Sequence, residues 1–323
     1  MARSRIFSFA ILALFALALL FFLHNFDPPG DTLLWQSISN SGHIPLFGLL
    51  SIIILRMINI IKRRHSTSWQ PYLITFLICA LLGFLSEVMQ ISGSRDADFW
   101  DIVRDIVGII FFLGISFSYG KNNAITGLKN GRTYRAMIFA GVTLILILGL
   151  IPLITTGVAY LHRNHAFPVI AKFDNLWELT FMRFSNLTLE IENLPIENIS
   201  DPINKAGKMT FYPADFSEFK IIEPIPDWQA YKQLAIEFYS TLATQLELHI
   251  KIEDKSHNGD FNDRFNQRFF IDSGYNKIAI PIVQIEKGPE FRLIDLEKIN
   301  SIALFTIGTQ ERFSIFINSI YLE

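Results

Sequence analysis

The chain has 323 residues, of which 50% are hydrophobic and 30 are Phe, and its formal net charge is −2. A net charge so close to zero gives no electrostatic basis for binding nucleic acid, so we exclude nucleic acid as a partner. The mean hydropathy of +0.33 is high for a soluble domain and low for a chain made only of membrane helices, which indicates a mixture of the two.

Five apolar runs in the first half of the chain are long enough to cross a bilayer, which takes about 20 helical residues. They cover approximately residues 6–23, 42–61, 72–90, 101–119 and 136–160. The first run follows a basic start, and no small-residue cleavage site comes after it. We therefore expect a retained anchor and not a cleaved signal peptide.

Basic residues are concentrated in alternate connections between these runs. Arg3 and Arg5 precede the first run, KRRH (62–65) follows the second, and further Lys and Arg residues lie between the fourth and fifth. By the positive-inside rule we expect a cytoplasmic N-terminus, a cytoplasmic loop at 121–135 and an outward-facing connection at 91–100. Five crossings then place residues 161–323 outside the cytoplasm, in the periplasm if the cell is Gram-negative.

From Phe167 onward the hydrophobic period shortens to that of strands. Alternating or aromatic-rich runs are separated by Gly, Pro, Asn and Asp, as in LTLEIENL, KQLAIEFYS, QLELHIKIED and NKIAIPIV. Eight or so such runs without a helical pattern favour an antiparallel β-sandwich over residues 161–323. The predicted fold class is a membrane all-α bundle of five helices followed by an all-β sandwich.

Polar side chains cluster where the third and fourth apolar runs meet. They are Glu87, Gln90, Arg95, Asp98, Asp101, Arg104 and Asp105. Glu87 and Asp105 lie inside the apolar runs, where each costs a few kcal/mol if it faces lipid. We therefore expect both to face the bundle interior, with the two arginines as available partners.

Two interpretations of this cluster stay open. It is either a functional polar site or a structural set of ion pairs. As a functional site, its carboxylates could act as acid and base, bind a metal, or join an arginine in holding a phosphate. The sequence indicates no particular cofactor.

The spacing of these residues resembles the signature of the VanZ-like family of bacterial membrane proteins. The matching positions are Glu87, Gln90, Arg95, Asp98, Asp101 and Gly108, with His43 at the start of the second run. His43 can equally be a polar anchor at the membrane interface, and Asp105 departs from the Asn that the family commonly has. The resemblance covers residues 1–120 and implies a role in the cell envelope, with membrane lipids as partners.

The segments NKIAIPI, LIDLEKINSIALF and FSIFINSIYLE resemble the C-terminal half of galactose-binding-like jelly rolls, which include carbohydrate-binding modules. That resemblance implies a jelly-roll sandwich that stacks sugars on exposed aromatic rings. The candidate ligand-binding residues are Trp177, Trp228, Tyr231 and Arg268. The alternative is that these aromatic side chains belong to the core.

Taken together, the two halves favour a binding protein of the bacterial envelope. The sandwich would bind a glycan or a lipid-linked saccharide, and the charged membrane site would contact a lipid headgroup. The alternative is a membrane enzyme that acts on a lipid or lipid-linked saccharide, with the Glu/Asp cluster as its acid–base groups.

Overall fold

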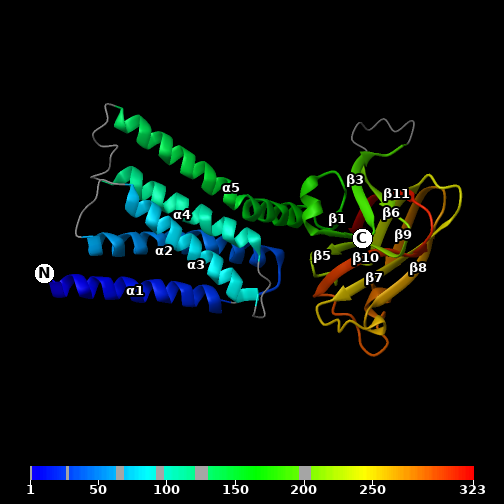
Figure 1. Ribbon diagram of the computed structural model, residues 1–323. Coiled ribbons are helices and arrows are strands. Elements are labelled where there is room, and N and C mark those ends of the chain that lie inside the picture. The colour runs from blue at the N-terminus through cyan, green and yellow to red at the C-terminus, as the bar shows by residue number, and fades with distance from the viewer. Residues whose placement is uncertain (1, 27–28, 63–68, 92–97, 121–129, 196–204) are drawn as a thin grey trace. The chain divides into compact units, whose positions relative to one another are not determined.

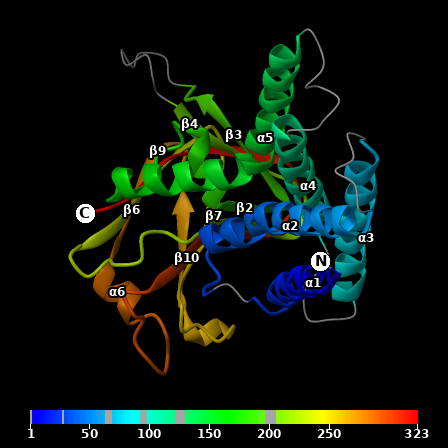
Figure 2. The ribbon, with the colours of Figure 1, turned by 90° about the vertical axis from the view of Figure 1, so that its left-hand side faces the viewer.

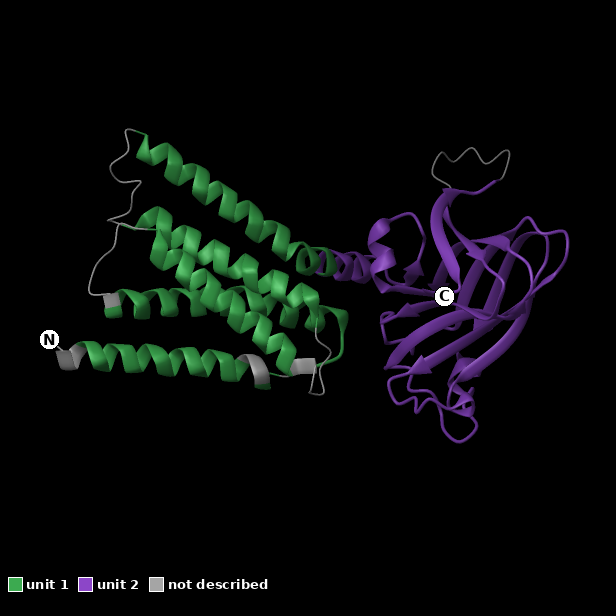
Figure 3. Ribbon diagram, viewed as in Figure 1, with its two compact units in different colours: residues 1–156 green, residues 157–323 purple. Residues whose placement is uncertain are grey.

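The computed structural model describes residues 2–26, 29–62, 69–91, 98–120, 130–195 and 205–323. The chain divides into two compact units, a helical unit of residues 1–156 and a β unit of residues 157–323 (Figure 3). The predicted combination of a helical bundle and a β-sandwich is confirmed.

Among the described residues, five helices are long and apolar enough to cross a membrane. They are α1 (Ala2–Asn25), α2 (Leu33–Lys62), α3 (Gln70–Ile91), α4 (Phe99–Tyr119) and α5 (Gly131–Ala166). Helix α2 lies against α1, α3 and α4, so it forms the centre of the helical unit (Figures 1 and 2). Its buried side chains Phe47 and Leu50 pack with Ile109 of α4 in a small apolar core.

Helix α2 begins well before the apolar run that predicts it. The apolar run begins at about residue 42, whereas the helix starts at Leu33. No Pro or Gly interrupts residues 33–41, so nothing stops the helix from extending. The polar side chains of this first part make contacts inside the unit, since Ser37 Oγ lies 3.0 Å from Thr156 Oγ1 of α5.

Glycine allows α2 and α4 to pack at very close range. A Cβ atom built on Gly108 of α4 would lie 2.1 Å from the carbonyl oxygen of Ile44 in α2. The obstacle is backbone, which cannot move aside as a flexible side chain can. Small residues that bring two helix backbones together are a typical device of membrane helix packing. Because His43 is the neighbour of Ile44, this contact also sets the position of His43 relative to α4.

We predict that Gly108→Ala separates α2 from α4 and destabilises the helical unit by about 1–3 kcal/mol, the usual cost of overpacking. Thermal unfolding of the full chain in detergent, followed by helical circular dichroism, measures the change. Gly141→Ala is the matched control, because a Cβ atom on Gly141 of α5 meets no heavy atom within 4 Å. Equal melting of the two variants would contradict the close approach.

The β unit is a sandwich of two antiparallel sheets. One sheet has the order β3-β4-β11-β6-β9 with β1 beside β11, and the other has the order β2-β5-β10-β7-β8. Strands β4 to β7 alternate between the sheets, as do β9 to β11, which is the connectivity of a jelly roll. The strands are β1 (Val169–Ala171), β2 (Met182–Ser185), β3 (Leu187–Asn193), β4 (Lys205–Phe211), β5 (Ala214–Ile222), β6 (Gln233–Ser240), β7 (Leu246–Asp254), β8 (Phe265–Ile271), β9 (Gly274–Pro281), β10 (Ile299–Thr309) and β11 (Phe313–Leu322).

Short helical elements complete the β unit. They are η1 (Leu176–Phe181), η2 (Phe261–Asp263) and α6 (Ile282–Glu286). The inward side chains of both sheets form one apolar core that includes Phe219, Phe238 and Ile250.

Strand β5 is not among the segments expected from the sequence, although it pairs with both β2 and β10. Its inward positions are Ser217, Phe219 and Ile221. Ser217 is fully buried at the place where an apolar residue would have completed the alternation. The run of alternating apolar residues in this strand is therefore too short to be recognised from the sequence.

Candidate functional site

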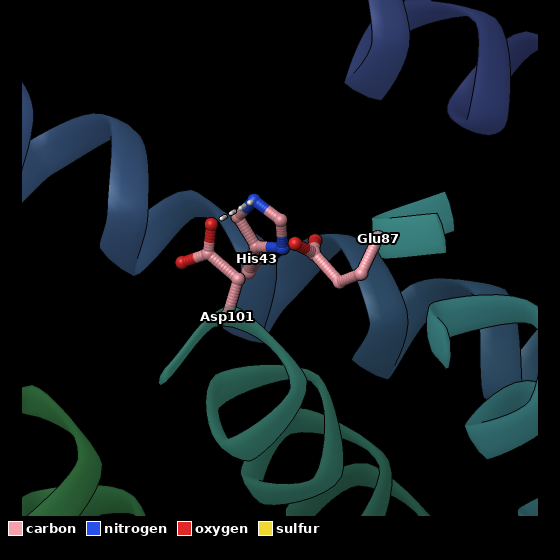
Figure 4. Close-up of side chains that lie close together, drawn as sticks. All are labelled: His43, Glu87 and Asp101. Atoms are coloured by element: carbon pink, nitrogen blue, oxygen red, sulfur yellow. Dashed lines mark ion pairs between the residues drawn. The ribbon is translucent and has the colours of Figure 1, made fainter. Parts of the chain in front are cut away.

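A polar site lies in the helical unit, where three helices each contribute an ionisable side chain. His43 comes from α2, Glu87 from α3 and Asp101 from α4, and the three point toward one another (Figure 4). One ring nitrogen and one oxygen of each carboxylate all lie within 4.8 Å of one another. Glu87 and Asp101 are both buried. The structure thus brings together three residues that the sequence selects.

His43 is held by Asp105, one turn after Asp101 on α4. The Nδ1 atom of His43 lies 2.9 Å from Oδ1 of Asp105, and Asp105 is 1% exposed. The partner of Asp105 is thus a histidine, not one of the two arginines expected from the sequence. The other ring nitrogen, Nε2, lies 3.7 Å from Oδ2 of Asp101.

Asp98 and Arg104 complete the surroundings of the site at the start of α4. Asp98 is the N-cap of α4, because its Oδ1 accepts a hydrogen bond of 2.9 Å from the backbone N–H of Trp100. Its own backbone N–H donates to Oε2 of Glu87 at 3.1 Å. Arg104 forms an ion pair with Oδ1 of Asp101 and lies 3.5 Å from Oδ2 of Asp98.

The second oxygen of Asp105 is buried and has no hydrogen-bond partner among the described residues. It lies against Gly83 of α3, where a Cβ atom would approach Oδ2 to 2.6 Å. The missing side chain of Gly83 therefore provides the room that Asp105 occupies. Of the other predicted residues, Gln90 belongs to α3, and Arg95 lies outside the described residues.

The aromatic candidates of the β unit do not form one site. Trp228 is fully buried in the core and donates its Nε1–H to the carbonyl of Ile225 at 2.8 Å, so it presents no ring face to a ligand. Tyr231 packs against the same core and the ring of Phe167. Trp177 in η1 is 37% exposed and lines a small, mostly apolar pocket.

Arg268 belongs to a second candidate surface, the outer face of the β2-β5-β10-β7-β8 sheet. We call it the charged-aromatic face. Its side chains alternate with those that enter the core, and they are Phe216, Glu218, Lys220, His249, Lys251, Arg268, Phe270, Phe305 and Ile307. One row of paired residues crosses the whole sheet, in the order Ser185, Glu218, Phe305, His249 and Arg268.

Aromatic rings lie at the centre of the charged-aromatic face. The ring of Phe305 is 5.3 Å from that of Phe216 and 5.0 Å from that of His249, between centroids. The guanidinium of Arg268 lies over the ring of Phe270 at 5.6 Å. Phe216 is 40% exposed and Phe270 is 45% exposed, so both rings are accessible on this face.

Charged groups on this face are held in place by one another. Lys251 Nζ lies 2.6 Å from Glu218 Oε1, and Lys220 Nζ lies 3.0 Å from Glu253 Oε2. Glu253 also accepts a hydrogen bond of 2.9 Å from the Ser301 hydroxyl. Burial alone would raise the pKa of Glu253, but Lys220, Ser301 and Lys251 together lower it from 4.5 to about 2.

This pKa shift predicts acid lability of the sandwich. A carboxyl whose pKa is lower in the folded state contributes stability above its unfolded pKa, and that stability is lost as the pH falls from 4.5 toward about 2. We expect Glu253→Gln to lower the free energy of unfolding by about 2 kcal/mol at pH 7 and to flatten its decline in acid. Glu247→Gln, whose side chain is 44% exposed, is the control and should change neither quantity measurably. Denaturant unfolding of the full chain at several pH values tests both.

No protein-family model matches the chain, and a search of curated proteins found no match in sequence. Solved structures are similar to the sandwich in fold. One is a family 11 carbohydrate-binding module from Clostridium thermocellum in complex with a β-1,3-1,4-mixed-linked tetrasaccharide. It is 14% identical with a TM-score of 0.37, and the match covers 48% of this chain and 93% of that chain.

Two further solved structures show the same kind of likeness. An exo-β-agarase is 14% identical with a TM-score of 0.37, over 48% of this chain but only 25% of that chain. A carbohydrate-binding module specific for non-crystalline cellulose is 14% identical with a TM-score of 0.30, over 42% of this chain and 79% of that chain. The predicted β-sandwich is confirmed by its two sheets, and the resemblances to carbohydrate-binding modules and to the VanZ-like family stay predictions.

Proposed function

We propose that the protein is a five-span membrane protein of a bacterial envelope, VanZ-like in its helical half, that binds a glycan or a lipid-linked saccharide. The β unit would lie outside the cytoplasm and bind the saccharide on the charged-aromatic face. The observation that carries the proposal is the exposure of Phe216 and Phe270 on a surface whose charged groups are already fixed in position.

Such a surface suits the two kinds of contact that a sugar ring offers. The apolar C–H face of a pyranose packs against the face of an aromatic ring. Its hydroxyl groups both donate and accept hydrogen bonds, and charged partners make these bonds stronger. Lys251, Glu218 and Arg268 supply donors and acceptors around the exposed rings. Lys251 is paired with Glu218 and Arg268 with Glu247, and these ion pairs reduce the ordering that binding requires.

We expect Phe216→Ala to weaken binding of the full chain, in detergent, to bacterial envelope glycans by about tenfold, or about 1.4 kcal/mol. A glycan array that includes peptidoglycan fragments identifies the ligand, and titration calorimetry measures the change. The matched control is Tyr275→Ala on the opposite sheet, whose ring is 58% exposed. A folded chain that binds no glycan on the array, or equal losses in both variants, would refute the proposed face.

A second candidate function is enzymatic, and one observation favours it. In the helical unit, Nδ1 of His43 lies 2.9 Å from Oδ1 of Asp105, and with its hydrogen on Nδ1 the oriented imidazole would take a proton at Nε2. A carboxylate that orients a histidine base is a recurrent catalytic arrangement. A membrane enzyme acting on a lipid or lipid-linked saccharide would use this pair with Glu87 and Asp101.

The two functions differ in their response to Asp101→Asn. If the protein is an enzyme, purified chain incubated with lipid-linked saccharides forms a new product, and Asp101→Asn or His43→Ala abolishes it. If it only binds, mass spectrometry finds the substrates unchanged with every variant. Phe216→Ala serves as the comparison, since loss of a ring on the sandwich would raise KM and leave kcat unchanged.

A further inference from the structure

We propose that His43, Glu87 and Asp101 form a binding site for a divalent transition-metal ion, with Zn²⁺ as the first candidate. The proposal does not depend on saccharide binding by the sandwich. Each residue comes from a different helix, and each offers one atom to a common centre (Figure 4). The site would join α2, α3 and α4 through a single ion.

The distances are close to those that a metal requires. With Zn²⁺ bonds of about 2.0–2.1 Å and tetrahedral angles, the ligand atoms lie about 3.4 Å apart. The Nε2 atom of His43 is 3.7 Å from Oδ2 of Asp101, and all three candidate atoms fall within 4.8 Å of one another. Side-chain adjustments of about 1 Å would complete the geometry.

Each ligand is oriented by a contact of its own, as ligands of metal sites normally are. Nδ1 of His43 lies 2.9 Å from Oδ1 of Asp105, and with its hydrogen on Nδ1 the ring turns Nε2 toward Asp101 as the metal-binding nitrogen. Arg104 pairs with Oδ1 of Asp101 and leaves Oδ2 on the side of His43. The backbone N–H of Asp98 holds Oε2 of Glu87 at 3.1 Å. These contacts place the ligands before any ion is bound.

A second, independent observation is the charge beside the site. Asp105 is 1% exposed, and its Oδ2 has no hydrogen-bond partner among the described residues. An incompletely paired carboxylate is costly between apolar helices, and a nearby cation compensates it. In this arrangement Asp105 does not bind the ion itself; it orients His43 and offsets part of the ion's charge.

The donor set selects the kind of ion. One imidazole nitrogen with two carboxylate oxygens suits Zn²⁺ or Mn²⁺, whereas Mg²⁺ and Ca²⁺ prefer oxygen ligands alone. Three protein ligands leave one position of a tetrahedral ion for water or for an oxygen of a bound molecule.

Calorimetry with Zn²⁺, and separately with Mn²⁺, on the tag-free full chain in detergent tests the site. We expect one Zn²⁺ per chain, with Mg²⁺ and Ca²⁺ failing to compete. His43→Ala and Asp101→Asn should each abolish saturable binding. Asp105→Asn should weaken it by about 10–100-fold, the usual effect of losing an outer-shell partner. His165→Ala in α5, an exposed histidine, is the matched control and should bind as wild type.

Circular dichroism and gel filtration establish that each variant is folded, so that loss of binding is not loss of structure. Two outcomes overturn the proposal. One is a folded wild-type chain that binds neither Zn²⁺ nor Mn²⁺ at one site per chain. The other is metal binding that His43→Ala and Asp105→Asn leave unchanged. Glu87→Gln gives a further check if Asp101→Asn does not fold.

Discussion

A carboxylate buried among apolar helices needs a partner close at hand, and this requirement shapes the packing of the helical unit. Asp105 obtains His43 as its partner because α2 and α4 approach so closely beside it, at Ile44 and Gly108. It obtains space because α3 presents Gly83 to its second oxygen. The glycines and the polar residues therefore belong to one arrangement, in which close backbone contact is the condition for pairing the charge.

In the sandwich, charged side chains are held in place by a network of ion pairs and hydrogen bonds on the outer face of one sheet. That face carries many charges in water, where single ion pairs contribute little. Glu253 nevertheless sits in a network with Lys220, Ser301 and Lys251, and its side chain is 8% exposed. The network fixes long side chains around the exposed rings of the charged-aromatic face. A surface of this kind is ordered before a ligand arrives, which lowers the cost of binding.

Much of the architecture could be predicted from hydrophobic period alone. Apolar runs of membrane length predict the five long helices found among the described residues, and period-two runs predict most of the strands. Strand β5 is not predicted because the buried Ser217 breaks its alternation of apolar and polar residues. The first part of α2 is not predicted because its residues are polar, although no helix breaker lies among them. Both cases arise from tertiary contacts that a local pattern does not contain.

The candidate sites were partly predictable for the same reason. Helical spacing grouped Asp101 with Asp105, and the position of Glu87 inside an apolar run marked it as inward-facing. Asp105 and His43 are 62 positions apart in the sequence, so their pairing cannot be predicted from local spacing. On the sandwich, Trp228 is an attractive ligand residue by type but is buried, while Phe216 and Phe305 meet only through the register of β5 and β10.

The position of β10 has a consequence for how this chain can change in length. It is hydrogen-bonded to β5 on one side and β7 on the other, with Leu304 facing the core and Phe305 facing outward. One inserted residue would exchange the two faces for the rest of the strand. We therefore expect one residue inserted between Leu304 and Phe305 to disrupt both pairings, whereas the exposed residues 310–312 between β10 and β11 can be lengthened without exchanging the faces.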